Sequence, residues 1–155
     1  MPKRINRAIE LLEQGQPIFY TGGQTGADLS YECGVGMAKT WADYISIDFE
    51  HHPFDVVGLT RFMEGLRDGG PTRSGHVTPT VIVTLPSNAK TPEEVRYNSW
   101  QIRHVLTAGV HGILNTHCRT PEAVRAFVEE CRWPFAKIGA GGRGGMVAVH
   151  AAAHH

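Results

Sequence analysis

The segment YISIDFEHHPFD, residues 44–55, decides the fold that the sequence predicts. A short β-branched run ends in a polar cluster that contains Asp48, Glu50 and His51, and Asp55 can then cap a helix. A strand, a polar tip and a helix in this order are how α/β proteins present functional groups at the carboxyl end of a sheet. A histidine that follows a carboxylate by three residues also suits a general base with its orienting partner. We therefore expect an α/β fold with a functional cluster at a strand end.

The alternation of strands and helices continues on both sides of this segment. Apolar and β-branched runs predict strands at residues 17–21, 44–48, 80–85 and 112–117. Helical spacing and capping signals predict helices at about 5–15, 27–39, 55–69, 91–109 and 120–131. The spacing in the last helix puts these residues on its buried side: Val124, Phe127, Val128 and Cys131. One helix followed by strand–helix units implies parallel strands joined by right-handed crossovers.

Length and composition limit the class of protein. The 155 residues suit one domain, and we expect residues 1–135 to form it. Residues 136–155 contain many glycines and small residues, which predicts a loop and a poorly anchored tail. Fifteen basic and fifteen acidic residues cancel, which argues against nucleic acid or an anionic membrane surface as a partner. The three cysteines, the absence of a signal segment and the absence of a long apolar run predict a cytoplasmic protein.

Three stretches of the chain resemble the HpcH/HpaI aldolase (aldolase/citrate lyase) family. Residues 44–51 are similar to the Asp-x-Glu-His sequence that ends a strand in these enzymes. Residues 108–114, AGVHGIL, are similar to a second family segment. Residues 120–124 together with residues 131–135, CRWPF, are similar to a third. The three matches occur in the family's order, and together they span most of the chain.

The resemblance implies the fold and the chemistry of a metal-dependent aldolase. The fold would be the N-terminal half of a (β/α)8 TIM barrel, about four β/α units preceded by a helix. The reaction would be class II carbon–carbon cleavage of a 4-hydroxy-2-oxo acid to pyruvate or a related oxo acid plus an aldehyde. A divalent ion (Mg, Mn or Co) would act as Lewis acid. His51 would be the general base, Asp48 would orient it, and Glu50 would support the site.

The chain also departs from the family pattern at two places. The family has an arginine at the end of its third strand, and residues 81–86, VIVTLP, contain none. The family's metal-binding Glu and Asp belong to the fifth and sixth strands. These lie beyond the end of this chain, so we expect no metal ligand within it.

Other polar residues at strand ends are candidates for binding substrate. His117 ends the fourth predicted strand, and Thr84 and Gln24 lie at the ends of two other strands. His117 could equally be structural, and Thr84 and Gln24 carry little weight alone. For Asp48, Glu50 and His51, the alternative is a solvated turn whose carboxylates cap the next helix. The strand-end position and the family pattern favour the active site.

Two other functions remain open on the sequence alone. The first is a truncated, catalytically incompetent member of the aldolase family that acts only as a binding or assembly module. The second is a histidine-rich, metal-dependent hydrolase on a barrel scaffold, because a fold does not fix its chemistry. In each case a half barrel leaves open sheet edges and a partly uncovered apolar face. We therefore expect a homo-oligomer, a marginally stable chain, or a fragment whose second half lies elsewhere.

Overall fold

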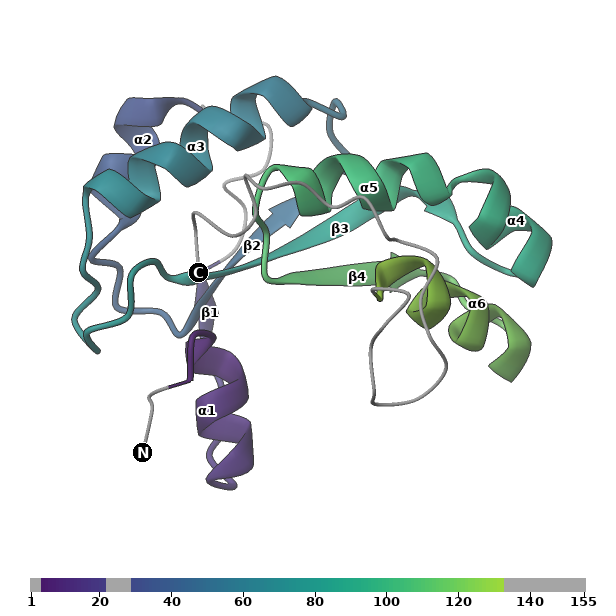
Figure 1. Cartoon of the computed structure of the whole chain (residues 1–155), viewed down its shortest axis with the longest axis horizontal. Coiled ribbons are helices and arrows are strands. Elements are labelled where there is room, and N and C mark those ends of the chain that lie inside the picture. The colour runs from purple at the N-terminus through teal and green to yellow at the C-terminus, as the bar shows by residue number, and fades with distance from the viewer. Residues whose placement is uncertain (1–3, 22–28, 133–155) are drawn as a thin grey trace.

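Helices and strands alternate along the described part of the chain (Figure 1). A computed structural model describes residues 4–21 and 29–132. In chain order the elements are α1 (Arg7–Glu13), β1 (Tyr20–Thr21), α2 (Tyr31–Met37), β2 (Tyr44–Asp48), α3 (Val56–Asp68), β3 (Thr80–Asn88), α4 (Pro92–Tyr97), α5 (Ser99–Thr107), β4 (Gly112–Thr116) and α6 (Pro121–Cys131). The predicted α/β order is confirmed. No helix in these described ranges is long and apolar enough to cross a membrane.

The strands form one parallel sheet in the order β1-β2-β3-β4. β2 and β3 pair from Tyr44↔Thr80 to Asp48↔Thr84. β3 and β4 pair from Ile82↔Gly112 to Thr84↔Leu114, and the register then shifts before Asn88↔Thr116. Because the strands are parallel, their carboxyl ends lie along one edge of the sheet. Asp48 is the last residue of β2 and so lies at that edge.

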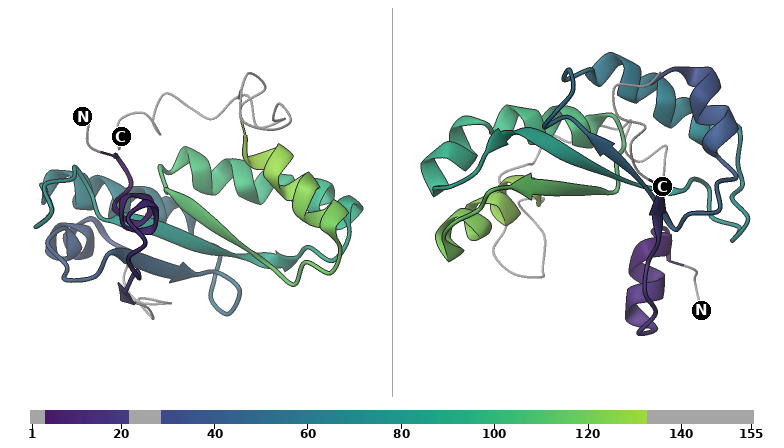
Figure 2. Two further views of the ribbon diagram at one scale, coloured as in Figure 1. Left: turned by 90° about the horizontal axis from the view of Figure 1, so that it is seen from below. Right: turned by 180° about the vertical axis from the view of Figure 1, so that it is seen from behind.

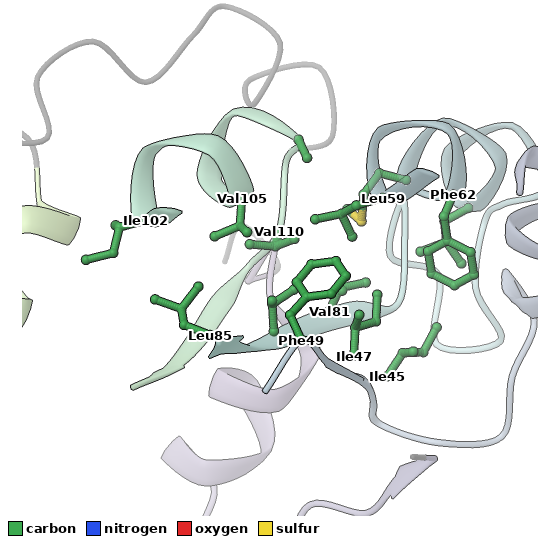
Figure 3. Close-up of a cluster of buried hydrophobic side chains, with 14 residues drawn as sticks. Ile45, Ile47, Phe49, Leu59, Phe62, Val81, Leu85, Ile102, Val105 and Val110 are labelled. Carbon is green, nitrogen blue, oxygen red and sulfur yellow. The ribbon is translucent and has the colours of Figure 1, made fainter. Parts of the chain in front are cut away.

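The main core lies between one face of the sheet and the helices α2, α3 and α5 (Figures 1 and 3). Alternate strand residues point into it, because successive side chains of a strand face opposite sides. The buried strand residues are Ile45, Ile47, Val81, Val83 and Leu85, and they pack with Leu59, Phe62, Met63 and Leu66 of α3. The residues between them on each strand therefore face the other side of the sheet.

Helices α2 and α3 approach each other closely at two glycines. A Cβ atom on Gly65 would lie 2.1 Å from the carbonyl oxygen of Tyr31, and one on Gly34 would lie 2.2 Å from that of Phe62. Glycine in a helix interior costs about 1 kcal/mol relative to alanine, so its presence at two positions of α2 needs a reason. The structure gives the reason for Gly34, because any side chain there would push the two helices apart.

Side-chain caps fix the starts of several helices. Asp55 accepts a hydrogen bond from the N–H of Gly58 at the start of α3, as predicted. The helix predicted over residues 91–109 is wrong in one respect, because it is divided into α4 and α5 at Asn98. The Asn98 amide donates from Nδ2 to the carbonyl oxygen of Glu94 at 2.9 Å. This hydrogen bond ends α4 and lets the chain change direction before α5.

Two further predictions need correction. β1 contains only Tyr20 and Thr21, whereas the predicted strand began at residue 17. The reason is that the N–H of Phe19 donates to the side chain of Asp43, not to a strand carbonyl. In α6, Val124 is 47% exposed, although its spacing predicted burial. Ala123 and Ala126 are buried instead, because α6 packs against the helix that contains Val95.

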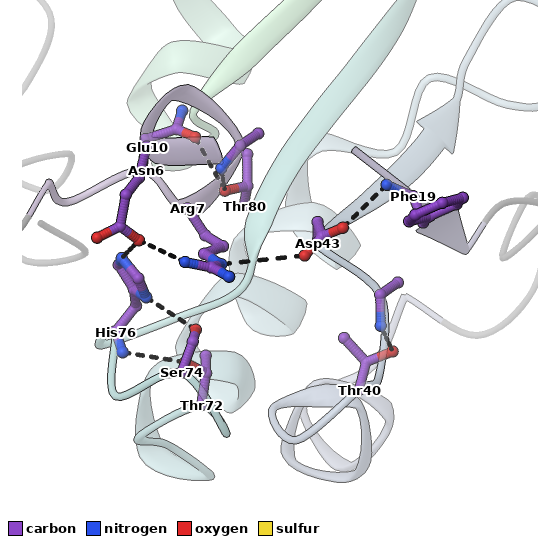
Figure 4. A network of polar contacts seen from close by, with 12 residues as sticks. Asn6, Arg7, Glu10, Phe19, Thr40, Asp43, Thr72, Ser74, His76 and Thr80 are labelled. Atoms are coloured by element: carbon purple, nitrogen blue, oxygen red, sulfur yellow. Dashed lines mark hydrogen bonds and ion pairs between the residues drawn. The ribbon is translucent and has the colours of Figure 1, made fainter. Parts of the chain in front are cut away.

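Helix α1 lies on the side of the sheet opposite to α2 and α3 (Figure 2). Its first turn is attached to the start of β3 (Figure 4). Thr80 Oγ1 donates to Asn6 Oδ1 at 3.0 Å and accepts from the N–H of Ala8 at 3.3 Å. Beside this contact, a cavity of about 300 Å³ opens between Arg7 and Trp41. All of these residues lie at the amino ends of the strands, far along the sheet from Asp48.

Candidate active site

The candidate site is built on the loop that follows β2. Phe49 is 2% exposed, and its N–H donates to the carbonyl oxygen of Thr84 on β3 at 3.0 Å. Its ring lies edge-on to Phe54, with ring centroids 5.2 Å apart. The buried Phe49 therefore fixes the loop to the core. The polar residues before and after it, Asp48 and Glu50, remain at the edge of the sheet.

Asp48 and His51 form a close pair. Nδ1 of His51 lies 2.7 Å from Oδ2 of Asp48. The other carboxylate oxygen, Oδ1, accepts hydrogen bonds from the N–H groups of Glu50 at 2.8 Å and His51 at 3.3 Å. Three hydrogen bonds thus hold the Asp48 carboxylate in place. When Nδ1 of His51 carries the proton, its Nε2 has a free lone pair on a side chain that is 68% exposed.

The pair shifts the pKa of both members. Burial alone would raise the pKa of Asp48, but the hydrogen bonds from the His51 ring and from two backbone N–H groups outweigh it. The pKa of Asp48 is therefore lowered. The hydrogen bond and the negative charge of Asp48 raise the pKa of His51. Asp48 stays ionised, and His51 becomes a stronger base than an isolated imidazole.

A second carboxylate–imidazole pair crosses the edge of the sheet. Oε1 of Glu50 lies 2.7 Å from Nε2 of His117, which follows β4. His117 has a φ of 59°, a left-handed conformation that is costly for a residue other than glycine. The contact with Glu50 occurs in this strained conformation. The loops after β2 and β4, the two strands on either side of β3, are thereby connected.

The structure places the other predicted residues differently. Thr84 is paired in register with Asp48, but only 7% of its surface is exposed. Its carbonyl oxygen holds Phe49, so its clearest role is to position the loop. Gln24 lies outside the described residues. The sequence predicted Glu50 and His117 as separate site residues, but it did not predict the contact between them.

A divalent ion could contact three of these residues. Asp48, Glu50 and His51 each offer one ligand atom, and these atoms lie within 4.8 Å of one another. However, an ion held by all three would separate Asp48 from His51, because Oδ2 of Asp48 and Nδ1 of His51 already bind each other. Magnesium also requires near-octahedral oxygen ligation. Among the described residues this cluster fits a proton-transfer pair, not a complete metal site.

The fold is also found in solved structures. An HpcH/HpaI aldolase/citrate lyase family protein from Burkholderia cenocepacia J2315 matches with a TM-score of 0.68 and 23% identity. That match covers 96% of this chain and 51% of the other. This chain has the fold of that family protein. Macrophomate synthase matches with a TM-score of 0.58 and 23% identity, over 90% of this chain and 38% of the synthase.

These comparisons confirm the predicted resemblance at the level of the fold. The chain spans about half the length of the Burkholderia protein, since the match covers 51% of it. The four parallel strands in sequential order thus correspond to part of a TIM-barrel-like structure. No family model matches the sequence, and no curated protein matches it.

Proposed function

We propose that this chain is a class II aldolase-type carbon–carbon lyase that acts on 4-hydroxy-2-oxo acids. Its products would be pyruvate or a related 2-oxo acid and an aldehyde. The observation that carries the proposal is the Asp48–His51 pair at the carboxyl edge of a parallel sheet, with 2.7 Å between Oδ2 and Nδ1. Catalytic residues of barrel enzymes come from this edge. The fold shared with an aldolase/citrate lyase family protein supports the same class of reaction.

His51 would move the proton in both halves of the cleavage. Its Nε2 accepts the proton of the C4 hydroxyl group as the C3–C4 bond breaks, and the aldehyde forms at C4. The electron pair of that bond becomes the enolate of the 2-oxo acid. The His51 imidazolium then returns its proton to C3, which gives the oxo acid. Asp48 holds the ring in place and stabilises the imidazolium, because its lowered pKa keeps it negatively charged.

Glu50 and His117 would form the other side of the substrate site. Their 2.7 Å contact presents the second imidazole, 54% exposed, at the same edge of the sheet as His51. An exposed imidazole can donate a hydrogen bond to a carboxylate or carbonyl oxygen of the substrate. Thr84, whose carbonyl oxygen holds Phe49, would act as a positioning residue.

A divalent ion is part of the proposal. In the family that the chain resembles, Mg, Mn or Co would stabilise the enolate oxygen as a Lewis acid. Its ligands would include groups beyond Asp48, Glu50 and His51, because that cluster is already occupied by its own hydrogen bonds. We further propose a cytoplasmic location, which the small, odd number of cysteines in the sequence supports.

Exchange of the pyruvate methyl protons in D2O tests the proposal. The 155-residue chain is incubated with pyruvate and Mg, Mn or Co in turn, and deuterium uptake is followed by mass spectrometry. We expect uptake that falls by about 100-fold or more in His51→Ala, because a general base contributes roughly 10²–10⁴ in rate. His52→Ala is the matched control and should keep the wild-type rate. Uptake at the wild-type rate in His51→Ala would contradict the assignment of the base.

A binding or assembly module is the second candidate function. One observation favours it, namely that the match covers only 51% of the aldolase/citrate lyase family protein. Such a module would keep the fold and bind an oxo acid without turnover. Absence of deuterium uptake with every ion, together with pyruvate binding seen by isothermal titration calorimetry, would favour this candidate over the lyase.

A further inference from the structure

Among the residues that the structure describes, one face of the sheet is only partly covered. Because Ile47 and Val83 point into the helix-covered core, the residues next to them in β2 and β3 point to the opposite side. We call this side the open face and define it by these residues: Tyr20, Tyr44, Ser46, Ile82 and Leu114. Tyr20 and Tyr44 stack there, with ring centroids 5.2 Å apart. Tyr20 and Leu114 are each 56% exposed.

An open face of this kind is unusual for a parallel sheet. Such sheets occur almost only with both faces covered, since their strands are apolar on both sides. Helix α1 covers the amino end of the open face, where Ala8 hydrogen-bonds to Thr80. At the carboxyl end Leu114 remains 56% exposed, whereas its register partner Thr84 on β3 is only 7% exposed. The five residues that define the open face are uncharged, and the Asp48 carboxylate lies on the same side only at the carboxyl edge of the sheet.

The edges of the sheet are also incomplete. Among the described residues, β1 pairs only with β2, and β4 pairs only with β3. Unpaired strand edges favour association with another chain. A TIM barrel removes both edges by closing eight parallel strands around a filled interior. The described sheet has four strands, and the match covers 51% of the aldolase/citrate lyase family protein, which leaves close to half of that protein to cover the equivalent face.

We propose that the open face docks a second copy of this chain. Rotation by half a turn about the barrel axis would place β4 of each copy beside β1 of the other, and all strands would stay parallel. Two copies supply the eight strands of a closed barrel. Leu114 and Ile82 of both copies would then fill the interior. The formal net charge of zero means that two copies do not repel each other at long range.

This arrangement places two candidate sites at one rim. The rotation axis runs along the barrel, so the carboxyl edges of both sheets face the same way. Each copy would bring its own Asp48–His51 pair to that rim. The inference does not depend on the proposed lyase activity, because it rests on the sheet face and edges alone.

Sedimentation equilibrium tests whether two copies of the chain form this dimer. We expect the wild type to have a mass twice the 17.0 kDa of one chain. Leu114→Glu puts a charge in the proposed interior and should weaken the dimer by about 100-fold or more. Val57→Glu is the matched control, because Val57 is 66% exposed on α3, which covers the other face of the sheet. The dimer of this variant should be as strong as that of the wild type. Circular dichroism of both variants checks that the monomer remains folded.

Three results would overturn the proposal. The first is a wild type that is monomeric at all concentrations, in which case something other than a second copy covers the face. The second is equal dimer strength in Leu114→Glu and Val57→Glu, which would put the interface elsewhere. If Leu114→Glu fails to fold, Tyr20→Lys takes its place, since Tyr20 is 56% exposed at the other end of the face. A dimer unaffected by Tyr20→Lys is the third overturning result.

Discussion

The contact between α2 and α3 predicts that Gly65→Ala destabilises the protein. A Cβ atom at this position would lie 2.1 Å from the Tyr31 carbonyl oxygen and 2.9 Å from the Val35 nitrogen, both of them backbone atoms. Ordinary contacts are about 3.5 Å or longer, so the helices would have to separate by roughly 1 Å. Overpacking of this kind costs about 1–3 kcal/mol and sometimes more. The higher helix propensity of alanine offsets only about 1 kcal/mol of this cost.

We therefore expect a net loss of about 1 kcal/mol, or roughly 2–4 °C in Tm, in Gly65→Ala. Urea and thermal unfolding followed by circular dichroism measure it. Gly36→Ala is the matched control on α2, because a Cβ atom there meets nothing within 4 Å. That change should stabilise the protein by about 0.5–1 kcal/mol. If Gly65→Ala is as stable as Gly36→Ala, the close approach of the two helices is wrong.

Three other predictions concern a helix cap, a thiol and the pH dependence of exchange. Thr120→Ala should lower the free energy of unfolding in urea by about 1 kcal/mol, because Thr120 Oγ1 accepts a hydrogen bond from the N–H of Ala123 at the start of α6. Thr120→Ser keeps the hydroxyl group and should keep the wild-type stability. Equal stability of all three proteins would argue against the cap. Burial raises the pKa of the Cys131 thiol to about 12. In a variant without Cys33 and Cys118, a disulfide reagent at pH 8 should therefore react with Cys131 slowly in the native protein and quickly in urea; rapid native labelling would disprove the burial. Deuterium uptake by pyruvate should rise with pH through the raised pKa of His51, since only the neutral imidazole accepts a proton, and a rate independent of pH would count against His51.

The sequence predicted those elements whose signals are local. Residues 44–55 encode a strand, a polar loop and a cap within one short segment, and β2, Asp55 and α3 all occur as predicted. Asp48 and His51 are three residues apart, so their pairing was also expected from the sequence. The resemblance to an aldolase family indicated the fold that the solved structures confirm.

The features that the sequence did not predict depend on contacts between distant residues or on competition within a helix. Glu50 and His117 are 67 positions apart, and only the order of the strands in the sheet brings them together. The break at Asn98 depends on one side chain that bonds to the Glu94 carbonyl. The burial of α6 depends on packing against α4, which helical spacing alone does not show.

The central claim is that Asp48 makes His51 a strong base at the edge of the sheet. The direct test is the titration of the His51 ring protons by NMR, in the wild type and in Asp48→Asn, without substrate or metal. We expect the wild-type His51 to titrate above the ordinary value of about 6.5, because Asp48 stabilises the imidazolium. In Asp48→Asn the pKa of His51 should fall towards that value. An identical His51 titration in the two proteins would contradict the pair, and with it the proposed mechanism.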